Sequence, residues 1–259
     1  MSESRYKLGV DVMSGDRSPA ELIQGCVEAS KINSSVIVAV GDEAMIQKEL
    51  EKFQYDEEKI LVLPSTEVIT MEDHPASACR TKKDSSVMVG CRALFEGIID
   101  AFWSPGNTGA TLTASLLVVG RIKGVKRPAI TIPVPTNKGW VLLLDAGANM
   151  DCHPLYLRQF AILGAVYCRL MMGVENPKVG LLNVGEEETK GNELALQAFE
   201  EIKKLPYAFA GNIEPTVIFS HAADVIVSDG FAGNVFLKTV EGTAKHVLKI
   251  IKEEISNNL

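Results

Sequence analysis

Short runs of β-branched and aliphatic residues in this chain end repeatedly in turns rich in Gly, Asn and Asp. Five such turns follow a run directly, at 11–16, 104–109, 145–149, 183–187 and 228–234. In α/β proteins, turns of this kind lie at the carboxyl ends of strands, where backbone amides and helix N-termini converge and ligands bind. Their repetition therefore predicts a single polar crevice that binds an anion.

Apolar runs with strand character alternate with amphipathic stretches of helical period between these turns. Strands are expected at 6–11, 36–40, 60–64, 101–103, 129–134, 141–144, 179–184 and 225–227, and helices at 19–30, 43–53, 85–97, 107–120, 154–172 and 190–204. The two runs at 129–134 and 141–144 are separated by a five-residue turn, so they are expected to pair as a hairpin. The alternation predicts an α/β fold with three layers, α/β/α, and a mostly parallel, doubly wound sheet.

Two segments stand apart from this regular alternation. The polar stretch 65–83 is too long for an ordinary connection, which indicates a functional or mobile loop. The segment 235–257 is an amphipathic helix with one apolar stripe and a Lys-rich opposite face. We expect one domain, 1–259, that carries both segments as elaborations.

Composition indicates which class of partner the protein binds and in which compartment it is found. A net charge of −7 and an isoelectric point near 5.3 argue against nucleic acid as the main partner, because phosphate backbones attract basic surfaces. The five cysteines are dispersed and form no C-x-x-C pair, a pattern typical of reduced thiols in a cytoplasm. No signal-peptide core and no apolar run of about 18 residues is visible. A cytoplasmic location is expected.

Common cofactor and catalytic motifs are absent from the sequence. It contains no G-x-G-x-x-G after the first strand, no P-loop, no G-x-S-x-G and no H-E-x-x-H. The four histidines show no spacing typical of metal ligands. We therefore expect no metal and no organic cofactor.

Longer segments of the chain resemble the phosphate acyltransferase (PlsX) family of bacterial phospholipid synthesis. The matching segments occur in the family's order, at 80–86, 104–110, 142–152, 179–187, 190–193 and 229–235. The resemblance runs from about Lys7 to the C-terminus. Ser14 stands where the family's opening turn usually has Gly. Family members also continue past the terminal helix with a further Gly-rich segment, which this sequence is expected to lack.

The resemblance implies transfer of a fatty acyl group from acyl carrier protein to inorganic phosphate, giving acyl phosphate for phosphatidic acid synthesis. It implies a fold like that of isocitrate and isopropylmalate dehydrogenases or of phosphotransacetylases, with no cofactor. It further implies a homodimer that associates peripherally with the membrane, together with the glycerol-3-phosphate acyltransferase. Phosphate is already a nucleophile, so the site must hold it beside a thioester and stabilise charge on the carbonyl oxygen.

Candidate site residues follow from the turns and the matching segments. Asn149, Lys190 and Asp229 are expected to be catalytic: Asn149 orients phosphate or the carbonyl, Lys190 supplies charge and Asp229 orients a donor. The residues expected to bind substrate are Asp11, Lys82, Lys83, Asn107, Thr108, Gly109, Gly147, Gly185, Gly230 and Asn234. Each has a structural alternative, since turn residues serve mostly to reach positive φ and the two lysines fit a solvated loop.

Three other functions stay open at this point. One is a short-chain phosphate acetyltransferase that uses coenzyme A, and another is a truncated, non-catalytic homologue that binds phosphate or carrier protein. The third, a decarboxylating dehydrogenase of the isocitrate type, is disfavoured because its acidic metal-binding pattern is missing. The terminal helix fits either contact with a membrane surface or packing against protein, including a partner subunit.

Overall fold

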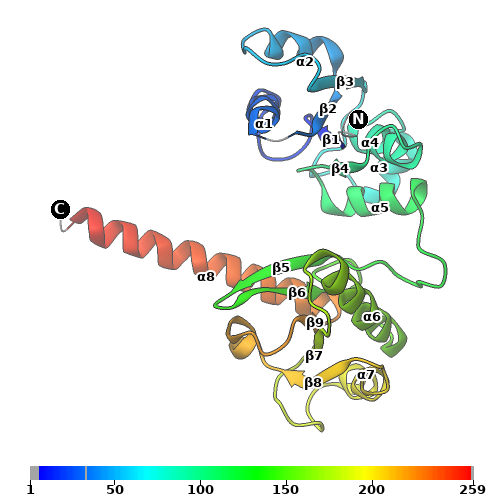
Figure 1. Cartoon of the computed structure of the whole chain (residues 1–259), viewed down its shortest axis with the longest axis vertical. Coiled ribbons are helices and arrows are strands. Elements are labelled where there is room, and N and C mark those ends of the chain that lie inside the picture. The colour runs from blue at the N-terminus through cyan, green and yellow to red at the C-terminus, as the bar shows by residue number, and fades with distance from the viewer. Residues whose placement is uncertain (1–5, 33, 258–259) are drawn as a thin grey trace. The chain divides into compact units, whose positions relative to one another are not determined.

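The computed structural model describes residues 6–32 and 34–257 (Figure 1). Contacts group the chain into two compact units, Met1–Arg121 and Ile122–Leu259, each built around its own sheet. The assignment of 1–259 to a single domain stays a prediction.

The first unit is a four-stranded parallel sheet with helices on both faces. Its elements are β1 (Lys7–Asp11), α1 (Pro19–Ile32), β2 (Val36–Gly41), α2 (Glu43–Leu50), β3 (Ile60–Pro64), α3 (Pro75–Thr81), α4 (Ser86–Phe95), β4 (Ala101–Trp103) and α5 (Thr108–Val118). The strand order is β3-β2-β1-β4. Val10, Ile37 and Ile60 face α1 and α2, whereas Val36 and Val38 face α4. This alternation is the period-two pattern of strands whose two faces are both covered.

The second unit holds a five-stranded mixed sheet. Its elements are β5 (Thr131–Thr136), β6 (Gly139–Leu144), α6 (Pro154–Met171), β7 (Lys178–Leu182), α7 (Glu193–Lys203), β8 (Ala208–Ile213), the 3₁₀ helix η1 (Pro215–Ser220), β9 (Val225–Val227) and α8 (Gly230–Asn257). The strand order is β5-β6-β9-β7-β8, with β5 antiparallel to β6 and the other pairs parallel. Helices α6 and α7 pack on one face around Phe160 and Phe199; η1 and the start of α8 pack on the other.

Helix α8 is buried only at its beginning. Gly230, Gly233 and Phe236 are buried, but every residue from Gly242 to Ser256 is exposed. The C-terminal half of the helix therefore extends into solvent with its apolar side chains uncovered (Figure 1). None of the described helices combines the length and the apolar character that crossing a membrane needs.

The α/β class, the strand–helix alternation and the β5–β6 hairpin are confirmed. The strands divide between two sheets rather than forming one, and the connection between them, residues 120–128 with positive-φ Gly120 and Gly124, forms no strand. Part of the polar loop 65–83 is helical, as α3. Helix α8 begins at Gly230, five residues earlier than expected, because the Asp229 carboxylate caps it by accepting the Ala232 N–H at 2.8 Å.

Strand β8 and helix η1 were not expected from the sequence. Strand β8 reads Ala-Phe-Ala-Gly-Asn-Ile, and Gly211 within it has φ of 83°. Two small residues, a glycine and an asparagine weaken strand propensity. The pairing with β7 supplies the order that the local sequence lacks.

Phe160 is fully buried between α6 and the sheet. We expect Phe160→Ala to lower the free energy of unfolding by about 3–5 kcal/mol, through lost apolar burial and the cavity it leaves. Phe95→Ala is the matched control, because Phe95 is mostly exposed, and it should change stability little. Denaturant titration of both variants checks this; equal losses would contradict the placement of the core.

Candidate active site

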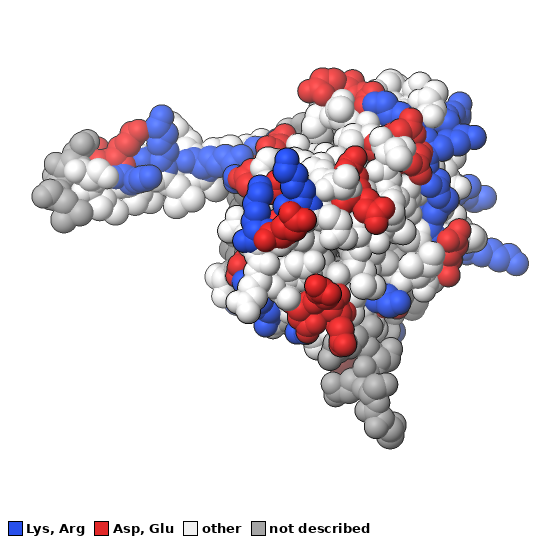
Figure 2. Space-filling model, turned by 90° about the horizontal axis from the view of Figure 1, so that it is seen from above, with Lys and Arg blue, Asp and Glu red and all other residues white. Residues whose placement is uncertain are grey.

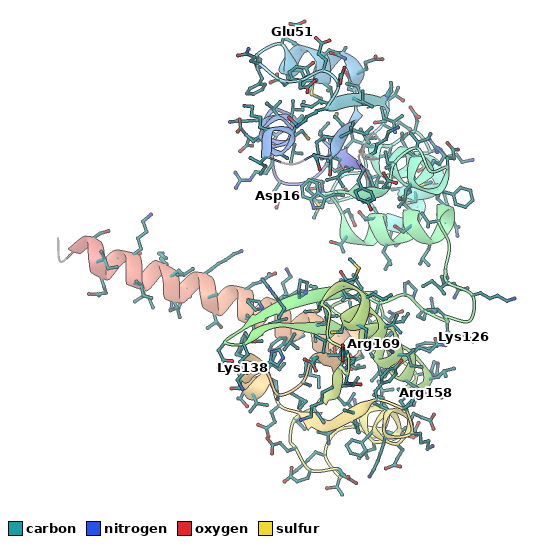
Figure 3. The ribbon with its side chains drawn as sticks, in the orientation of Figure 1. Asp16, Glu51, Lys126, Lys138, Arg158 and Arg169 are labelled. Atoms are coloured by element: carbon teal, nitrogen blue, oxygen red, sulfur yellow. The ribbon has the colours of Figure 1, made fainter. Side chains whose placement is uncertain are left out.

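The carboxyl ends of β1 and β4 carry two turns that hold each other in place. The Asp11 carboxylate is buried and accepts hydrogen bonds from the Met13 N–H at 3.0 Å and from the Ser104 hydroxyl at 2.7 Å. Gly15 has φ of 94°, and a Cβ there would lie 2.6 Å from the Pro105 carbonyl oxygen. The Asp11 carboxylate thus binds groups of its own unit. Asp16, at the end of the first turn, is exposed (Figure 3).

Asn107 caps the N-terminus of α5 and also binds the polar loop. Its Oδ1 accepts the Ala110 N–H at 3.1 Å, and its Nδ2 lies 3.3–3.4 Å from the carbonyl oxygens of Thr70, Met71 and Asp73. The next residue, Thr108, is exposed at the first position of α5. A Cβ on Gly109 would lie 2.8 Å from Pro75 Cγ, so the absence of a side chain at 109 lets α3 approach α5.

Lys82 and Lys83 differ in their surroundings. The Lys82 ammonium donates to Asp73 at 2.6 Å and to the Val68 carbonyl at 2.9 Å, and the hydrogen bond holds the pKa of the Asp73 carboxyl below its ordinary value. Lys83 is exposed, and its ammonium has no partner within the described part of the chain. Of the two, Lys83 keeps a cation free for a ligand, whereas Lys82 holds the polar loop.

In the second unit, the turn after β6 is organised by one buried carboxylate. Asp145 accepts five hydrogen bonds: from the N–H groups of Ile130, Gly147, Ala148 and Asn149, and from the Asn149 side chain, all at 2.7–3.1 Å. A buried polar group needs such partners, because leaving it without hydrogen bonds away from water costs free energy. Hydrogen bonds to this buried side chain therefore fix the conformation of residues 145–149.

The Asn149 amide is used within this turn. Its Nδ2 donates to the Pro128 carbonyl and to Asp145, both at 2.7 Å, and the backbone carbonyl oxygen of Asn149 accepts the Gly230 N–H at 2.8 Å. Cys152 follows three residues later, where burial raises the pKa of its thiol to about 11. The thiol therefore stays protonated near neutral pH and is a poor nucleophile.

The N-terminus of α8 packs directly on the Asp145 turn. Gly230 and Gly233 permit this, since a Cβ on Gly230 would lie 2.6 Å from the Asn149 carbonyl oxygen and one on Gly233 would collide with the Asp145 carbonyl oxygen. Asn234 reaches Gly147, whose Cβ position lies 3.5 Å from Asn234 Cγ. Among the described residues, the Asn234 amide has no hydrogen-bond partner, so both its donor and its acceptor are available.

The turn after β7 lies at the same edge of the sheet. Strands β6, β9 and β7 are neighbours and parallel, so their carboxyl ends are adjacent. Gly185 is buried, and its Cβ position lies 2.9 Å from Lys190 Cγ. The Lys190 side chain is exposed, and its ammonium has no partner among the described residues.

The structure brings five of the predicted residues of the second unit together at the carboxyl ends of its strands. Asn149, Asp229, Gly147, Gly230 and Asn234 meet around the Asp145 turn. Sequence reasoning missed Asp145 and Ser104 as the residues that hold the turns. The signal for Asp145 was present: an acidic residue directly after four apolar residues and directly before Ala-Gly-Ala-Asn.

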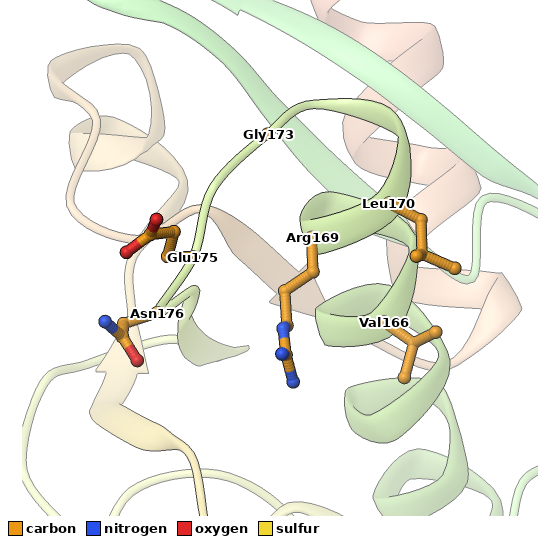
Figure 4. A pocket seen from close by; sticks show the side chains of 6 residues that line it. All are labelled: Val166, Arg169, Leu170, Gly173, Glu175 and Asn176. Carbon is orange, nitrogen blue, oxygen red and sulfur yellow. The ribbon is translucent and has the colours of Figure 1, made fainter.

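A separate cavity of about 640 Å³ lies at the end of α6 and the connection to β7 (Figure 4). It is lined by Val166, Arg169, Leu170, Gly173, Glu175 and Asn176. Because this connection leads into the amino end of β7, the cavity is not part of the candidate site. Among the described residues, no group of three or more His, Cys, Asp or Glu side chains is arranged to hold a metal ion.

The two asparagines of this site should respond differently to removal of their amides. We expect Asn149→Ala to lower the free energy of unfolding by about 1–3 kcal/mol, because it removes the donor to the Pro128 carbonyl and one of the five donors to the buried Asp145 carboxylate. Asn234→Ala removes no hydrogen bond and should leave the melting temperature nearly unchanged. Thermal unfolding of the two variants tests the assignment, and a larger loss for Asn234→Ala would refute it.

Comparison with known proteins places the chain in a family. Residues 6–259 match the family model described as fatty acid synthesis protein. A phosphate acyltransferase of Desulforamulus reducens is 46% identical over 251 residues, which are 96% of this chain and 74% of that protein. The phosphate acyltransferase of Clostridioides difficile is 44% identical over 95% of this chain and 73% of its own length.

Solved structures show the fold. The phosphotransacetylase EutD from Staphylococcus aureus matches 93% of this chain and 83% of its own with a TM-score of 0.66 at 16% identity. A 4-hydroxythreonine-4-phosphate dehydrogenase from Burkholderia phymatum matches 86% and 80% with a TM-score of 0.54 at 13% identity. The expected likeness to phosphotransacetylase and dehydrogenase folds is confirmed. With the family model matching nearly the whole chain, the protein belongs to the fatty acid synthesis protein family.

Proposed function

We propose that this protein is a phosphate acyltransferase that moves a fatty acyl group from acyl carrier protein to inorganic phosphate, giving acyl phosphate for phospholipid synthesis. Relatives at 42–46% identity bear the name phosphate acyltransferase. The observation in the structure that supports this most directly is the unpartnered Asn234 amide beside the first turn of α8. Helix N-termini favour anions, and side-chain donors beside them add directed hydrogen bonds.

The proposed reaction is a direct displacement. An oxygen of hydrogen phosphate forms a bond to the acyl carbon, the carbon–sulfur bond breaks, and the carrier thiolate leaves and takes up the proton that the phosphate gives up. Phosphate needs no activation by a base, so the site contributes by positioning and by stabilising charge on the carbonyl oxygen. The protonated Cys152 thiol fits this route, because a covalent acyl-enzyme would need a thiolate.

The proposed roles follow from which groups are free. In the second unit, Asn234 and the Lys190 ammonium bind phosphate or the carbonyl oxygen. In the first unit, Lys83, Thr108 and the first-turn amides of α5 offer donors to an anion. Asn149 and Lys82 act by holding the turns on which these groups stand. Asp229 positions the start of α8 as its cap, and Asp11, Asn107, Gly109, Gly147, Gly185 and Gly230 shape the turns.

Formation of acyl phosphate tests the function directly. Purified protein is incubated with palmitoyl-acyl carrier protein and phosphate, and the product is trapped with hydroxylamine. Acetyl-coenzyme A in a parallel reaction separates a long-chain enzyme from a short-chain acetyltransferase. We expect palmitoyl hydroxamate to form only when phosphate is present. If no hydroxamate forms in a phosphate-dependent way from either donor, the protein is a non-catalytic binding protein.

Asn234→Ala should lower turnover far more than stability. Loss of one donor at a site of developing charge costs about 3 kcal/mol, or roughly a hundredfold in rate. The kcat of each variant is compared with the wild-type kcat at saturating phosphate. Asn176→Ala, at the opposite end of the same unit, is a matched control and should keep normal turnover. Near-normal kcat in Asn234→Ala would remove this residue from the site.

We also propose that the exposed half of α8 contacts an anionic membrane surface. Val247, Ile251 and Ile255 recur every four residues and are about half exposed. Figure 2 shows lysines along the same part of the helix and acidic side chains near its end. An apolar stripe beside basic residues is the pattern of interfacial helices.

Ile251→Glu should release the protein from anionic vesicles while leaving turnover on carrier protein intact, because it places a charge in the middle of the stripe. His246→Glu adds the same charge away from the stripe and should weaken vesicle binding much less. Vesicle sedimentation at low and high salt measures both, and screening should weaken the wild-type binding. If Ile251→Glu instead dissociates a homodimer in the absence of lipid, the stripe is a subunit interface.

A further inference from the structure

The first unit has an apolar groove that its own helices leave open, between α1 and the edge strand β4. This α1–β4 groove has a volume of about 280 Å³ and is lined by Leu8, Val10, Leu22, Ala29, Ile37 and Trp103, with Gly25 and Cys26 on the helix side. Its lining is almost entirely carbon. Water in such a groove gains few hydrogen bonds, so an apolar ligand displaces it favourably.

The strand register explains why the groove exists. Trp103 is paired with Val10, so its side chain stands on the same face of the sheet as Val10 and toward α1. Strand β4 is the edge of this sheet, and α1 packs over β2 and β3. Half of the Trp103 side chain is therefore exposed, as one wall of a groove whose other wall is the helix.

Small residues on α1 keep the groove wide. Gly25 and Ala29 lie one turn apart on the helix face that borders it, and a Cβ built on Gly25 meets no atom within 4 Å. From Glu21 to Ala29 the helix advances about 12 Å. A larger side chain at position 25 would therefore enter this space.

The groove begins beside the turns that hold the candidate site in this unit. Trp103 is followed by Ser104, whose hydroxyl donates to Asp11 at 2.7 Å, and by the turn that leads to Asn107. Glu21, at the start of α1, lies at the same end of the groove. A ligand with a polar head at this turn can therefore extend an apolar tail along α1.

We propose that the α1–β4 groove binds the acyl chain of the substrate and sets its chain-length preference. This inference rests on the proposed function, and it names a long-chain acyl group rather than acetyl as the occupant. The groove is apolar, the Trp103 that lines it directly precedes the Ser104 turn, and no side chain at position 25 fills it. Each methylene that enters it should tighten binding by about fourfold.

Binding of alkyl phosphates tests the proposal without turnover. The chain contains two tryptophans, so Trp140→Phe leaves Trp103 as the only reporter. In this background, titration with butyl, octyl and dodecyl phosphate below their micelle concentrations should shift Trp103 emission to shorter wavelength. Affinity should rise steeply with chain length. Equal affinity for the three ligands, or no change in Trp103 emission, would overturn the proposal.

Gly25→Leu should fill the groove and remove the gain from chain length, lowering dodecyl phosphate affinity at least tenfold and leaving butyl phosphate affinity unchanged. Gly242→Leu is the matched control: it makes the same change at another helical glycine with open space around it and should keep the wild-type series. Leucine favours helix over glycine, so neither variant should unfold. An unchanged series in Gly25→Leu would refute the assignment of the groove.

Two further readouts separate this proposal from its alternatives. In acyl transfer, Gly25→Leu should shift the preference from palmitoyl toward short-chain carrier protein. If alkyl phosphates bind with affinity that depends on chain length but no acyl phosphate forms, the groove assignment stands and the proposed function is refuted. If acyl transfer occurs but its chain-length preference does not respond to the change at position 25, the function stands and the groove assignment is refuted. If Gly25→Leu changes the sedimentation mass instead of ligand binding, the groove is covered by another polypeptide and the proposal fails.

Discussion

The buried Asp145 carboxylate is the interaction on which the second unit's site depends. A charge removed from water is tolerated only if the protein surrounds it with donors, and here five N–H groups from the adjoining turn and from Ile130 provide them. The same residue's backbone carbonyl accepts the Ser228 hydroxyl at 3.1 Å and lies against Gly233. One side chain thus fixes the turn after β6, while its backbone fixes where α8 begins.

The first unit repeats this arrangement on a smaller scale. Asp11 is also buried, as the last residue of β1, and holds two turns through the Met13 N–H and the Ser104 hydroxyl. In both units the aspartate makes its hydrogen bonds to groups of the same unit, and so do the polar groups nearest to it, such as Asn149. In the second unit, Asn234 and Lys190 have no hydrogen-bond partner among the described residues, and both lie outside the turn that Asp145 holds. Rigid inner donors and free outer donors are what a preorganised anion site requires.

Much of this arrangement could be predicted from sequence, because Gly/Asn/Asp turns after apolar runs indicate strand ends. The hairpin and most helices followed from periodicity. The division of roles within the turns could not be predicted. Asn149 and Asn234 are equivalent as residue types, and only the positions of Pro128 and Asp145 show that the first is occupied. Lys82 and Lys83 are neighbours in sequence, and only Asp73, nine residues before Lys82, distinguishes them. Strand β8 was missed because its order comes from β7.

The proposed reaction transfers the acyl group directly to phosphate, without an acyl-enzyme. The decisive experiment mixes the protein with palmitoyl-acyl carrier protein in the absence of phosphate and measures the intact protein mass by mass spectrometry. We expect an unmodified protein mass and no release of carrier thiol until phosphate is added, when acyl phosphate forms. A palmitoyl adduct on Cys152, or on any other residue, that phosphate then discharges would contradict it.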